Sequence, residues 1–422
     1  MHKRVIAIVL SLVMVVTLTG IVGCAKPAGG AEPIVLGCPI SFKATPWPLG
    51  GKYGWELAVD EINAAGGVNV GGVMRPFKLI VLDTRDEEPG VPVSECLLGI
   101  EKLILDDKVD VLVGGPSMSE ASIAALDLVA KYDIVHLVTS GTWTPSWGKK
   151  VGGDIEKYRN SFKMSESAAH AVPVGLDLLE EVRKEHNLSK AYCIIDDCMF
   201  CRNAMDVFAG LGEKRGFTIL GRDAVPPGST DYSPALMKAK DSGADLLFFW
   251  TNTATSAILF KQFVDLEIPA LPVGFAAGAQ EHEVYKAVDG KCAYILFPNP
   301  HACQTATKLS GDVQFQEAFE SKFNKKPFGG CGGAYAGAYV LKDAIERAGS
   351  LDTDALITAL EATNLMTVNG RLMFGDNHED IYNQDPEKGI PTVYSQWING
   401  ERVAVWPLVL ADSEIVLPPW MK

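Results

Sequence analysis

Two stretches of this chain repeat one pattern, and the repeat decides the fold. They read Val109-Asp110-Val111-Leu112-Val113-Gly114 and Ala244-Asp245-Leu246-Leu247-Phe248-Phe249-Trp250. Each is a short apolar run of the kind that forms a buried strand. Each is followed by a polar loop, a helix pattern and a second apolar strand, at 134–138 in one copy and 268–273 in the other. The repeat predicts two similar α/β units.

The alternation of strands and helices extends outward from both copies. Strands at 34–36 and 77–83 and helices at 54–64 and 93–106 precede the first copy; strands at 191–196 and 217–223 and helices at 204–215 and 232–242 precede the second. Such alternation favours mainly parallel sheets covered by helices. We therefore expect an α/β fold with two Rossmann-like lobes.

The loops of the repeat indicate where a ligand would bind. Polar loops follow the first strands at 117–119 and 251–255, and the second strands lead into Thr139-Ser140-Gly141-Thr142 and Gly274-Phe275-Ala276-Ala277-Gly278. Ligands of open α/β sheets bind at the carboxyl ends of the strands. Facing lobes would present both sets of loops to one cleft, although a strand-loop-helix repeat can also be purely structural.

The N-terminal segment predicts export and lipid attachment. Lys3 and Arg4 precede an apolar run from Val5 to Leu18, which is typical of a secretory signal. Ile21-Val22-Gly23-Cys24 resembles the bacterial lipobox, in which the cysteine is acylated. We expect a signal peptide at 1–23, a short tether at 24–33, and an extracytoplasmic body held to the membrane by lipid on Cys24. The alternative is an uncleaved membrane anchor.

Composition narrows the class of protein further. The formal net charge is −14, and it becomes −16 without the two basic residues of the signal. An acidic body of this kind is a poor candidate for binding nucleic acid or an anionic bilayer surface. About 390 residues follow the tether, enough for two sizeable cores. We expect a monomer.

Eight cysteines accompany Cys24. An even number in an exported protein is compatible with disulfides, whose pairing the sequence does not give. Cys193, Cys198 and Cys201 have a spacing similar to an iron–sulfur motif, but Cys193 lies within a predicted strand and no fourth ligand is evident. Disulfides or reduced thiols are the better interpretation, and no metal is expected.

The segment Gly54 to Gly67, which includes Glu56-Leu57-Ala58-Val59-Asp60-Glu61-Ile62-Asn63-Ala64-Ala65, resembles a signature of type I periplasmic solute-binding proteins of the leucine/isoleucine/valine-binding family. Further matches follow in the same order: Asp106-Asp107-Lys108-Val109-Asp110, Gly115-Pro116, Thr139-Ser140-Gly141-Thr142, Pro227-Gly228-Ser229-Thr230-Asp231-Tyr232-Ser233 and Ala344-Ile345-Glu346-Arg347-Ala348-Gly349-Ser350. The resemblance covers nearly the whole chain after the tether.

The resemblance implies a hinge of three crossovers and a role in import. The crossovers would lie near residues 160, 296 and 369, which gives a first lobe of 34–160 plus 297–368 and a second of 161–296 plus 369–422. In this family the lobes close on a small molecule, and the closed form is handed to the membrane permease of an ABC importer. The alternative role is a receptor that presents the solute to a membrane signalling protein.

The resemblance also implies site residues. Ser119 and Thr142 match the positions that hold a ligand carboxylate, and Ser140 matches a carbonyl that accepts from an ammonium; Ser119 could instead be only a helix cap. Trp47 and Phe200 match aromatic residues that line the ligand pocket, although either could instead pack in the core or lie at the rim of the pocket. The full set of candidate ligand-binding residues is Trp47, Ser117, Ser119, Ser140, Gly141, Thr142, Trp143, Phe200, Trp250, Asn252 and Ala276.

Departures from the family pattern bear on the ligand. The acid that pairs with a ligand ammonium falls at Ala276, and a second acidic position reads Ala168-Ala169. A buried ammonium without a carboxylate is costly, which disfavours an α-amino acid unless Glu166, Asp196 or Asp197 substitutes. Glycines at 329–333, where relatives carry a bulky residue, would open space. We predict a small carboxylate with an apolar or aromatic body.

Enzyme motifs are absent from the sequence. It contains no Gly-x-Ser-x-Gly elbow, no His-Glu-x-x-His and no phosphate-binding Gly-x-x-x-x-Gly-Lys-Ser/Thr. Asp196 and Asp197 are adjacent on a predicted strand and would point to opposite faces, which argues against joint acid-base work. The sequence therefore predicts a binding protein that needs no cofactor.

Overall fold

The structure, a computed structural model, describes residues 31–43, 46–88, 90–253, 255–299, 301, 305–309 and 311–421. The expected signal peptide, the lipid site at Cys24 and most of the tether lie outside the described residues. Within the described part, no helix is both long and apolar enough to cross a membrane.

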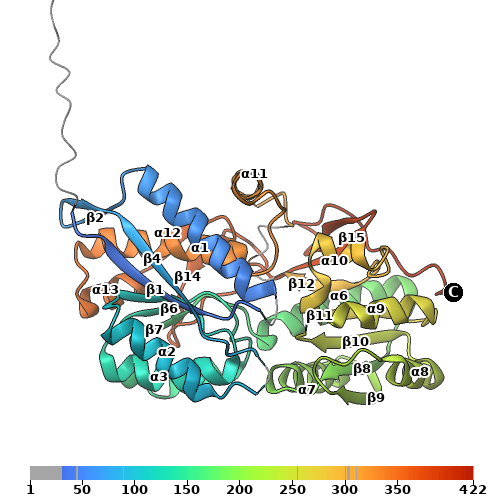
Figure 1. The fold of residues 1–422 in the computed structure, drawn as a ribbon. Helices are drawn as coiled ribbons and strands as arrows, with labels where there is room; N and C mark the ends of the chain where they lie inside the picture. Colours follow the sequence, from blue (N-terminus) through green and yellow to red (C-terminus); the bar gives the residue numbers. More distant parts are fainter. Residues whose placement is uncertain are drawn as a thin grey trace, which may run out of the picture.

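The first lobe is built on a five-stranded parallel sheet in the order β4-β1-β5-β6-β7 (Figure 1). The strands are β1 (Ile34–Ile40), β4 (Phe77–Asp83), β5 (Val111–Gly114), β6 (His136–Val138) and β7 (Ser161–Lys163). The other elements are α1 (Pro46–Ala64), α2 (Val93–Leu105), α3 (Ser119–Tyr132), α4 (Pro145–Gly153), α5 (Ile155–Tyr158), α11 (Asp312–Phe323), α12 (Cys331–Ala348), α13 (Thr353–Glu361), the hairpin β2 (Val68–Val70) with β3 (Val73–Arg75), and the hairpin β13 (Asn364–Thr367) with β14 (Gly370–Met373).

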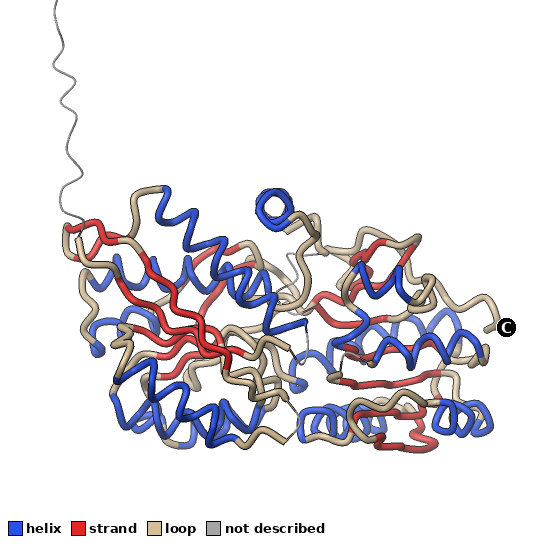
Figure 2. Tube along the Cα trace, viewed as in Figure 1, coloured by secondary structure: helices blue, strands red, loops and turns tan. Residues whose placement is uncertain are grey.

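The second lobe is built on a seven-stranded sheet in the order β16-β15-β12-β11-β10-β8-β9. Figure 2 shows its strands flanked by helices, as in the first lobe. The strands are β8 (Lys190–Asp196), β9 (Thr218–Val225), β10 (Leu246–Thr251), β11 (Leu271–Ala276), β12 (Leu296–Asn299) and the antiparallel β15 (Val393–Ile398) and β16 (Glu401–Trp406). The helices are α6 (Ala168–His186), α7 (Met199–Lys214), α8 (Ser233–Ser242), α9 (Ser256–Asp265), the 3-10 turn η1 (Ala277–Ala279) and α10 (His282–Ala287).

The repeat that opens the sequence occupies equivalent places in the two sheets. Numbered within its own lobe, each parallel set has the order 2-1-3-4-5, with β5 and β10 third and β6 and β11 fourth. The predicted α/β fold with two Rossmann-like lobes is confirmed. In this strand order the connections change direction between the first and third strands, and ligands bind at that switch point.

Each sheet is buried on both faces, as its near-continuous apolar strands require. In the first lobe, α1 and α12 cover one face with a cluster that includes Trp55, and α2 and α3 cover the other around Ile100 and Leu112. In the second, α6 and α7 pack on one face and α8 and α9 on the other. These cores hold the carboxyl ends of the strands in fixed positions.

The chain crosses between the lobes three times, somewhat later than residues 160, 296 and 369. Ser161–Lys163 pairs with β6, so the first crossing follows Lys163. β12 pairs with β11 in the second sheet, so the second crossing follows Asn299. Phe374 and Ile390 belong to the first-lobe core, so the third crossing lies between Ile390 and Val393. The β13–β14 hairpin, where a crossing was predicted, packs on the first lobe.

A buried ion pair joins the first crossing to the segment before the third. Lys163 Nζ lies 2.6 Å from Glu379 Oε1, and the two side chains are only 1% and 11% exposed. Lys163 Nζ also donates to the Thr142 carbonyl at 3.2 Å. The almost completely buried ammonium therefore has two acceptors in the protein.

Two further contacts link the remaining crossing segments. His301 Nε2, from the second crossing, lies 3.1 Å from Asp380 Oδ2. The Thr392 hydroxyl, in the third crossing, donates to the Glu166 carboxyl in the first. Polar contacts thus connect all three crossings in a region from which water is largely excluded.

Removal of the buried cation should destabilise the protein strongly. We expect Lys163→Met to lower the free energy of unfolding by about 3–5 kcal/mol, because Glu379 would stay buried without its partner. Urea denaturation followed by circular dichroism measures the change. Lys184→Met is the control: it removes an exposed pair with Glu181 and should cost about 0–1 kcal/mol. Equal effects of the two variants would contradict the assigned role of Lys163.

Candidate functional site

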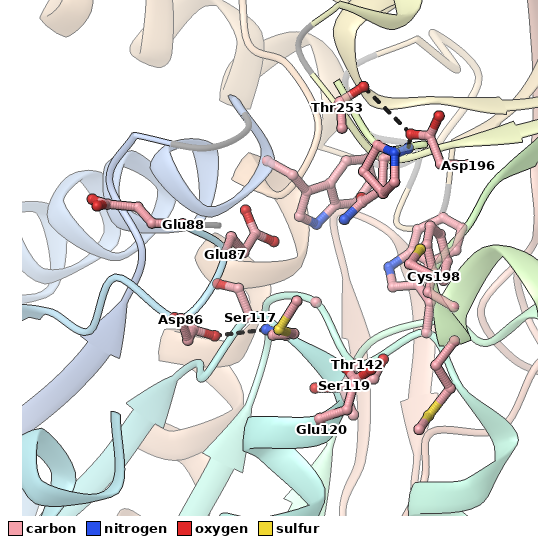
Figure 3. A pocket seen from close by; sticks show the side chains of 18 of the residues that line it. Asp86, Glu87, Glu88, Ser117, Ser119, Glu120, Thr142, Asp196, Cys198 and Thr253 are labelled. Carbon is pink, nitrogen blue, oxygen red and sulfur yellow. Dashed lines mark hydrogen bonds between the residues drawn. The ribbon is translucent and has the colours of Figure 1, made fainter. Parts of the chain in front are cut away.

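A cleft of about 400 Å³ lies between the lobes at the carboxyl ends of both sheets (Figure 3). The start of α1 and the segments that follow β4, β5 and β6 form one wall. The end of β8, the segments that follow β8, β9 and β10, and Phe275 of β11 form the other. The lining residues are Trp47, Asp86, Glu87, Glu88, Gly90, Val91, Ser117, Met118, Ser119, Glu120, Gly141, Thr142 and Trp143 from the first lobe and Asp196, Cys198, Met199, Phe200, Pro227, Gly228, Asn252, Thr253 and Phe275 from the second.

Two loops held together by the backbone form the polar part of the first-lobe wall. The Thr142 N–H donates to the Ser117 carbonyl at 3.1 Å. Gly141 has a φ of +72°, and a Cβ there would lie 2.0 Å from the Ser117 carbonyl oxygen, so this approach requires glycine. The Ser117 hydroxyl is buried and makes no hydrogen bond with the described part of the protein. A polar ligand atom in the cleft would satisfy it.

Ser119 is the first residue of α3, and Met118 occupies the N-cap position. Ser119 therefore does not cap the helix, which was its alternative role. The Asp86 carboxylate instead accepts the Met118 N–H at 2.7 Å. N–H groups in the first turn of a helix have no acceptor within the helix and carry a partial positive charge. The cleft side of α3 can therefore receive a carboxylate.

Aromatic rings from both lobes meet across the cleft and form an aromatic cluster of Trp47, Trp143, Phe200, Trp250 and Phe275. Trp143 lies 5.3 Å from Trp47 and 4.7 Å from Phe275 between ring centroids, and Trp47 lies 5.8 Å from Phe275. Phe200 completes the cluster at 5.6 Å from Phe275. Edge-to-face contacts of this kind stabilise the approach of the lobes and offer an apolar surface to a ligand.

The glycines at 329–333 were expected to open space, and Trp47 fills that space. A Cβ on Gly329 would lie 2.1 Å from Trp47 Cε3, and one on Gly330 would lie 2.4 Å from the Trp47 carbonyl oxygen. The absence of side chains there lets the Trp47 ring sit at the cleft. The glycines thus position a wall residue rather than enlarge the cavity.

Five acidic residues line the cleft, namely Asp86, Glu87, Glu88, Glu120 and Asp196, while the lining residues include no lysine, arginine or histidine. Glu88 pairs with Arg85 at 3.0 Å. Asp196, at the end of β8, accepts the Asn252 N–H at 2.8 Å, and its burial raises its pKa to about 6. Figure 3 shows it on the wall opposite Glu87. The site is therefore suited to a group that brings positive charge.

The other two acids considered as substitutes are placed elsewhere. Glu166 lies in the first crossing, lines a separate small cavity behind Trp47 and Trp143, and has its pKa raised to about 8 by burial. Asp197 is half exposed and pairs with Arg202 at 2.5 Å. Asp196 is thus the substitute that the structure brings to the cleft.

Most of the sequence-predicted residues meet at the cleft. Those that line it are Trp47, Ser117, Ser119, Gly141, Thr142, Trp143, Phe200 and Asn252. Three do not. Ser140 is buried with an unpaired hydroxyl, Trp250 lies behind the wall in the aromatic cluster, and Ala276 lies in the core that packs under α8 and α9.

Sequence reasoning missed Phe275 and most of the acidic wall. Ala276 and Phe275 are neighbours on β11, so they point to opposite faces, and Phe275 is the one that reaches the cleft. Asp86-Glu87-Glu88 follow β4 closely, and Glu120 is the second residue of α3. The position of these acidic residues close to the carboxyl ends of parallel strands is the sequence signal that could have placed them at the cleft.

The seven cysteines that the structure describes are free thiols: Cys38, Cys96, Cys193, Cys198, Cys201, Cys292 and Cys331. No disulfide joins any of them. Within the described residues, no group of three or more histidine, cysteine, aspartate or glutamate side chains could hold a metal ion. Cys193, Cys198 and Cys201 are therefore not gathered into such a group in the described structure.

Two lobes that close on a cleft at their switch points define a solute-binding protein of the periplasmic type. The sequence matches the periplasmic binding protein family over residues 43–383. The chain belongs to this family. It is a binding protein rather than an enzyme, in agreement with the sequence prediction.

Relatives and solved structures agree with this assignment. A Leu/Ile/Val-binding protein homologue of Brucella melitensis is 27% identical over 309 residues, which cover 72% of this chain and 76% of that protein. The substrate-binding protein LivJ of Streptococcus pneumoniae, solved with isoleucine, has a TM-score of 0.71 at 19% identity and covers 89% and 100% of the two chains. An ABC transporter solute-binding protein of R. palustris, solved with benzoate, has a TM-score of 0.72 at 15% identity and covers 88% and 95%.

The contact between Gly329 and Trp47 can be tested by adding one methyl group. We expect Gly329→Ala to lower the free energy of unfolding by about 1–3 kcal/mol, because the methyl overlaps the Trp47 ring. Gly210→Ala is the matched control, since nothing lies within 4 Å of a Cβ at that position in α7; it should be neutral or stabilising by about 1 kcal/mol. Urea denaturation of both variants gives the comparison, and a neutral Gly329→Ala would refute the contact.

Proposed function

We propose that this chain is the extracytoplasmic substrate-binding lipoprotein of an ABC importer and that it binds a small amino-acid-like carboxylate with a branched or aromatic body. The proposal rests on the fact that the cleft has three chemically different parts. Unpaired hydroxyl and helix N–H donors lie on the first-lobe wall, aromatic rings lie between the lobes, and Asp196 lies on the second-lobe wall. Each part matches one group of such a ligand.

The carboxylate end would bind Ser117, Ser119 and Thr142. These residues offer hydroxyls and the first N–H groups of α3, which favour an anion. The hydrocarbon body would pack on Trp143 and Phe275, whose rings offer apolar area with little loss of side-chain freedom.

The acidic lining favours a ligand that also carries an ammonium. A lone carboxylate would enter a cleft that holds five acidic residues and no cationic side chain. Burial of an uncompensated charge costs several kcal/mol. An α-ammonium beside Asp196 would compensate both the ligand carboxylate and the buried aspartate.

The runner-up ligand is an aromatic acid without an ammonium. Ala276 at the family's acidic position supports it, and the R. palustris neighbour is described with benzoate. This ligand would depend on the helix donors alone to balance its charge, in the presence of Asp196. We therefore rank it second.

The remaining parts of the proposal concern location and partners. Lipid on Cys24 and a tether of about nine residues would keep the body within about 20 Å of the membrane. At that distance the closed lobes could reach the permease of the importer. We propose that the body acts as a monomer, with no cofactor and no nucleic acid partner.

A thermal-shift screen with matched ligands tests the proposed substrate class. Phenylalanine is compared with 3-phenylpropionate and leucine with 4-methylpentanoate, pairs that differ only in the α-ammonium. We expect the amino acid of at least one pair to raise the melting temperature, because a ligand at 100 times its Kd stabilises by about 2.7 kcal/mol, and its deaminated partner to give a much smaller shift. Benzoate and 4-hydroxybenzoate complete the panel. A shift from the deaminated acids alone would overturn the ammonium assignment.

The pH dependence of affinity tests the role of Asp196. Its pKa is raised to about 6 by burial, so the carboxylate is charged above that pH and neutral below it. Affinity for the amino acid found in the screen should fall about tenfold between about pH 7.5 and pH 5 by titration calorimetry. Asp196→Asn should bind at least about tenfold more weakly at pH 7.5, with a flat profile. Asp197→Asn is the control and should behave as the wild type; equal losses in both variants would contradict the assignment.

A further inference from the structure

Two cysteines lie together at the start of α7, on the second-lobe wall of the cleft. Cys198 occupies the N-cap position of the helix and Cys201 lies in its first turn. Their sulfur atoms are 3.3 Å apart, in hydrogen-bond contact. β8 ends at Asp196, so the order is parallel strand, Cys-x-x-Cys, helix. A dithiol in this position has the sequence and backbone setting of redox-active pairs.

The two thiols differ in access and in acidity. Cys198 lines the cleft, whereas Cys201 is completely buried. The hydrogen bond with Cys201 lowers the pKa of the Cys198 thiol, and burial raises that of Cys201 well above its usual value. Burial raises the pKa of the other described cysteines as well, to about 12 for Cys38, Cys193, Cys292 and Cys331. Cys198 is therefore the thiol suited to attack, and Cys201 is placed to resolve the product.

We propose that Cys198 and Cys201 form a thiol–disulfide redox site in the wall of the cleft, which reacts with small-molecule disulfides. The site is independent of which solute the cleft binds. Oxidation or reduction of the pair changes the wall of the cleft through the two residues that lie between the cysteines.

The reaction is a two-step thiol–disulfide exchange. The Cys198 thiolate attacks one sulfur of a small disulfide, which breaks the S–S bond, releases one thiolate and leaves a mixed disulfide on Cys198. Cys201 then loses its proton and attacks the Cys198 sulfur, which forms the Cys198–Cys201 bond and releases the second thiolate. The protein thiols are oxidised, the small disulfide is reduced to two thiols, and those thiols take up the two protons.

A reactive role fits the geometry better than a structural one. A bond between residues three apart closes a very short loop, and the constraint that a disulfide places on the unfolded chain grows with loop length. A metal role lacks ligands, because no third cysteine, histidine or acidic side chain in the described structure completes a site with the pair. Cys193, the nearest cysteine before the pair in the sequence, is buried within β8.

Oxidation of the two cysteines would affect the cleft through Met199 and Phe200, which both line it. A disulfide requires a sulfur separation of about 2.05 Å, so the two cysteine side chains at the start of α7 must move from the 3.3 Å arrangement. The Phe200 ring contacts Trp143 at 5.9 Å and Trp250 at 6.0 Å. Phe200 thus connects the start of α7, where the two cysteines lie, to the aromatic cluster.

Mass spectrometry of the full-length protein tests the proposal. The reduced protein is desalted, incubated with oxidised glutathione, quenched with N-ethylmaleimide under denaturing conditions and digested with trypsin. Cleavage after Lys190 and Arg202 gives one peptide, 191–202, that contains Cys193, Cys198 and Cys201. We expect this peptide to lose two hydrogens through a Cys198–Cys201 bridge, with Cys193 alkylated, at least about tenfold faster than any other described cysteine reacts.

Three variants separate the steps. Cys201→Ser should accumulate glutathione on Cys198, and Cys198→Ser should leave Cys201 unmodified in the folded protein. Cys193→Ala is the matched control and should form the bridge at the wild-type rate. Wild-type protein that shows no bridge, a bridge that involves Cys193, or a stable glutathione adduct in wild type without release would each overturn the proposal. Dithiothreitol should restore both thiols, and a bridge that resists it would also count against a reversible site.

Discussion

The buried pair of Lys163 and Glu379 holds together the two segments of the first lobe from which the first and third crossings leave. The two side chains lie 2.6 Å apart and are almost completely buried, so the loss of either partner would leave the other charge buried and unpaired. Lys163 ends β7 and also donates to the Thr142 carbonyl, so one ammonium links the hinge to a residue of the cleft wall. Because both partners lie in the first lobe, a hinge motion can leave this pair intact, with the bending confined to the residues that follow Lys163 and Ile390.

Two sheets of the same strand order explain why the cleft forms where it does. In each lobe the loops after the first and third strands of the parallel set diverge at the switch point, which leaves a depression at the carboxyl edge. The three crossings hold these edges opposite each other. Ser117 therefore lines the same cleft as Asp196 and Asn252, although the segments are far apart in sequence. Ligand binding depends on these two facing sheet edges more than on any single helix or strand.

Much of this could be predicted from the sequence, because strand length, apolar runs and loop chemistry are local signals. The repeat at 109–114 and 244–250 predicts the two sheets, and the loops after it contain Ser117, Thr142 and Asn252 of the cleft. The direction in which a side chain points is not a local signal, because it depends on how the strands pair and pack. Phe275 rather than Ala276 reaches the cleft because of the register of β11, and Trp250 turns to the core. The place of Trp47 depends on the missing side chain of Gly329, a contact between segments that no local pattern contains.

The distribution of charge across the cleft couples ligand chemistry to closure. A ligand shifts an equilibrium between open and closed lobes only by as much as it prefers one state. Donors for a carboxylate lie on the first lobe around α3, and the acid suited to an ammonium, Asp196, lies on the second at the end of β8. A ligand with both groups gains its second contact only when the lobes meet, whereas a ligand with one group can be held by one lobe alone. For the proposed amino-acid-like ligand, the two charges therefore promote closure of the lobes as well as affinity. The aromatic cluster between the two charge sites sets the length of the ligand that can join the lobes.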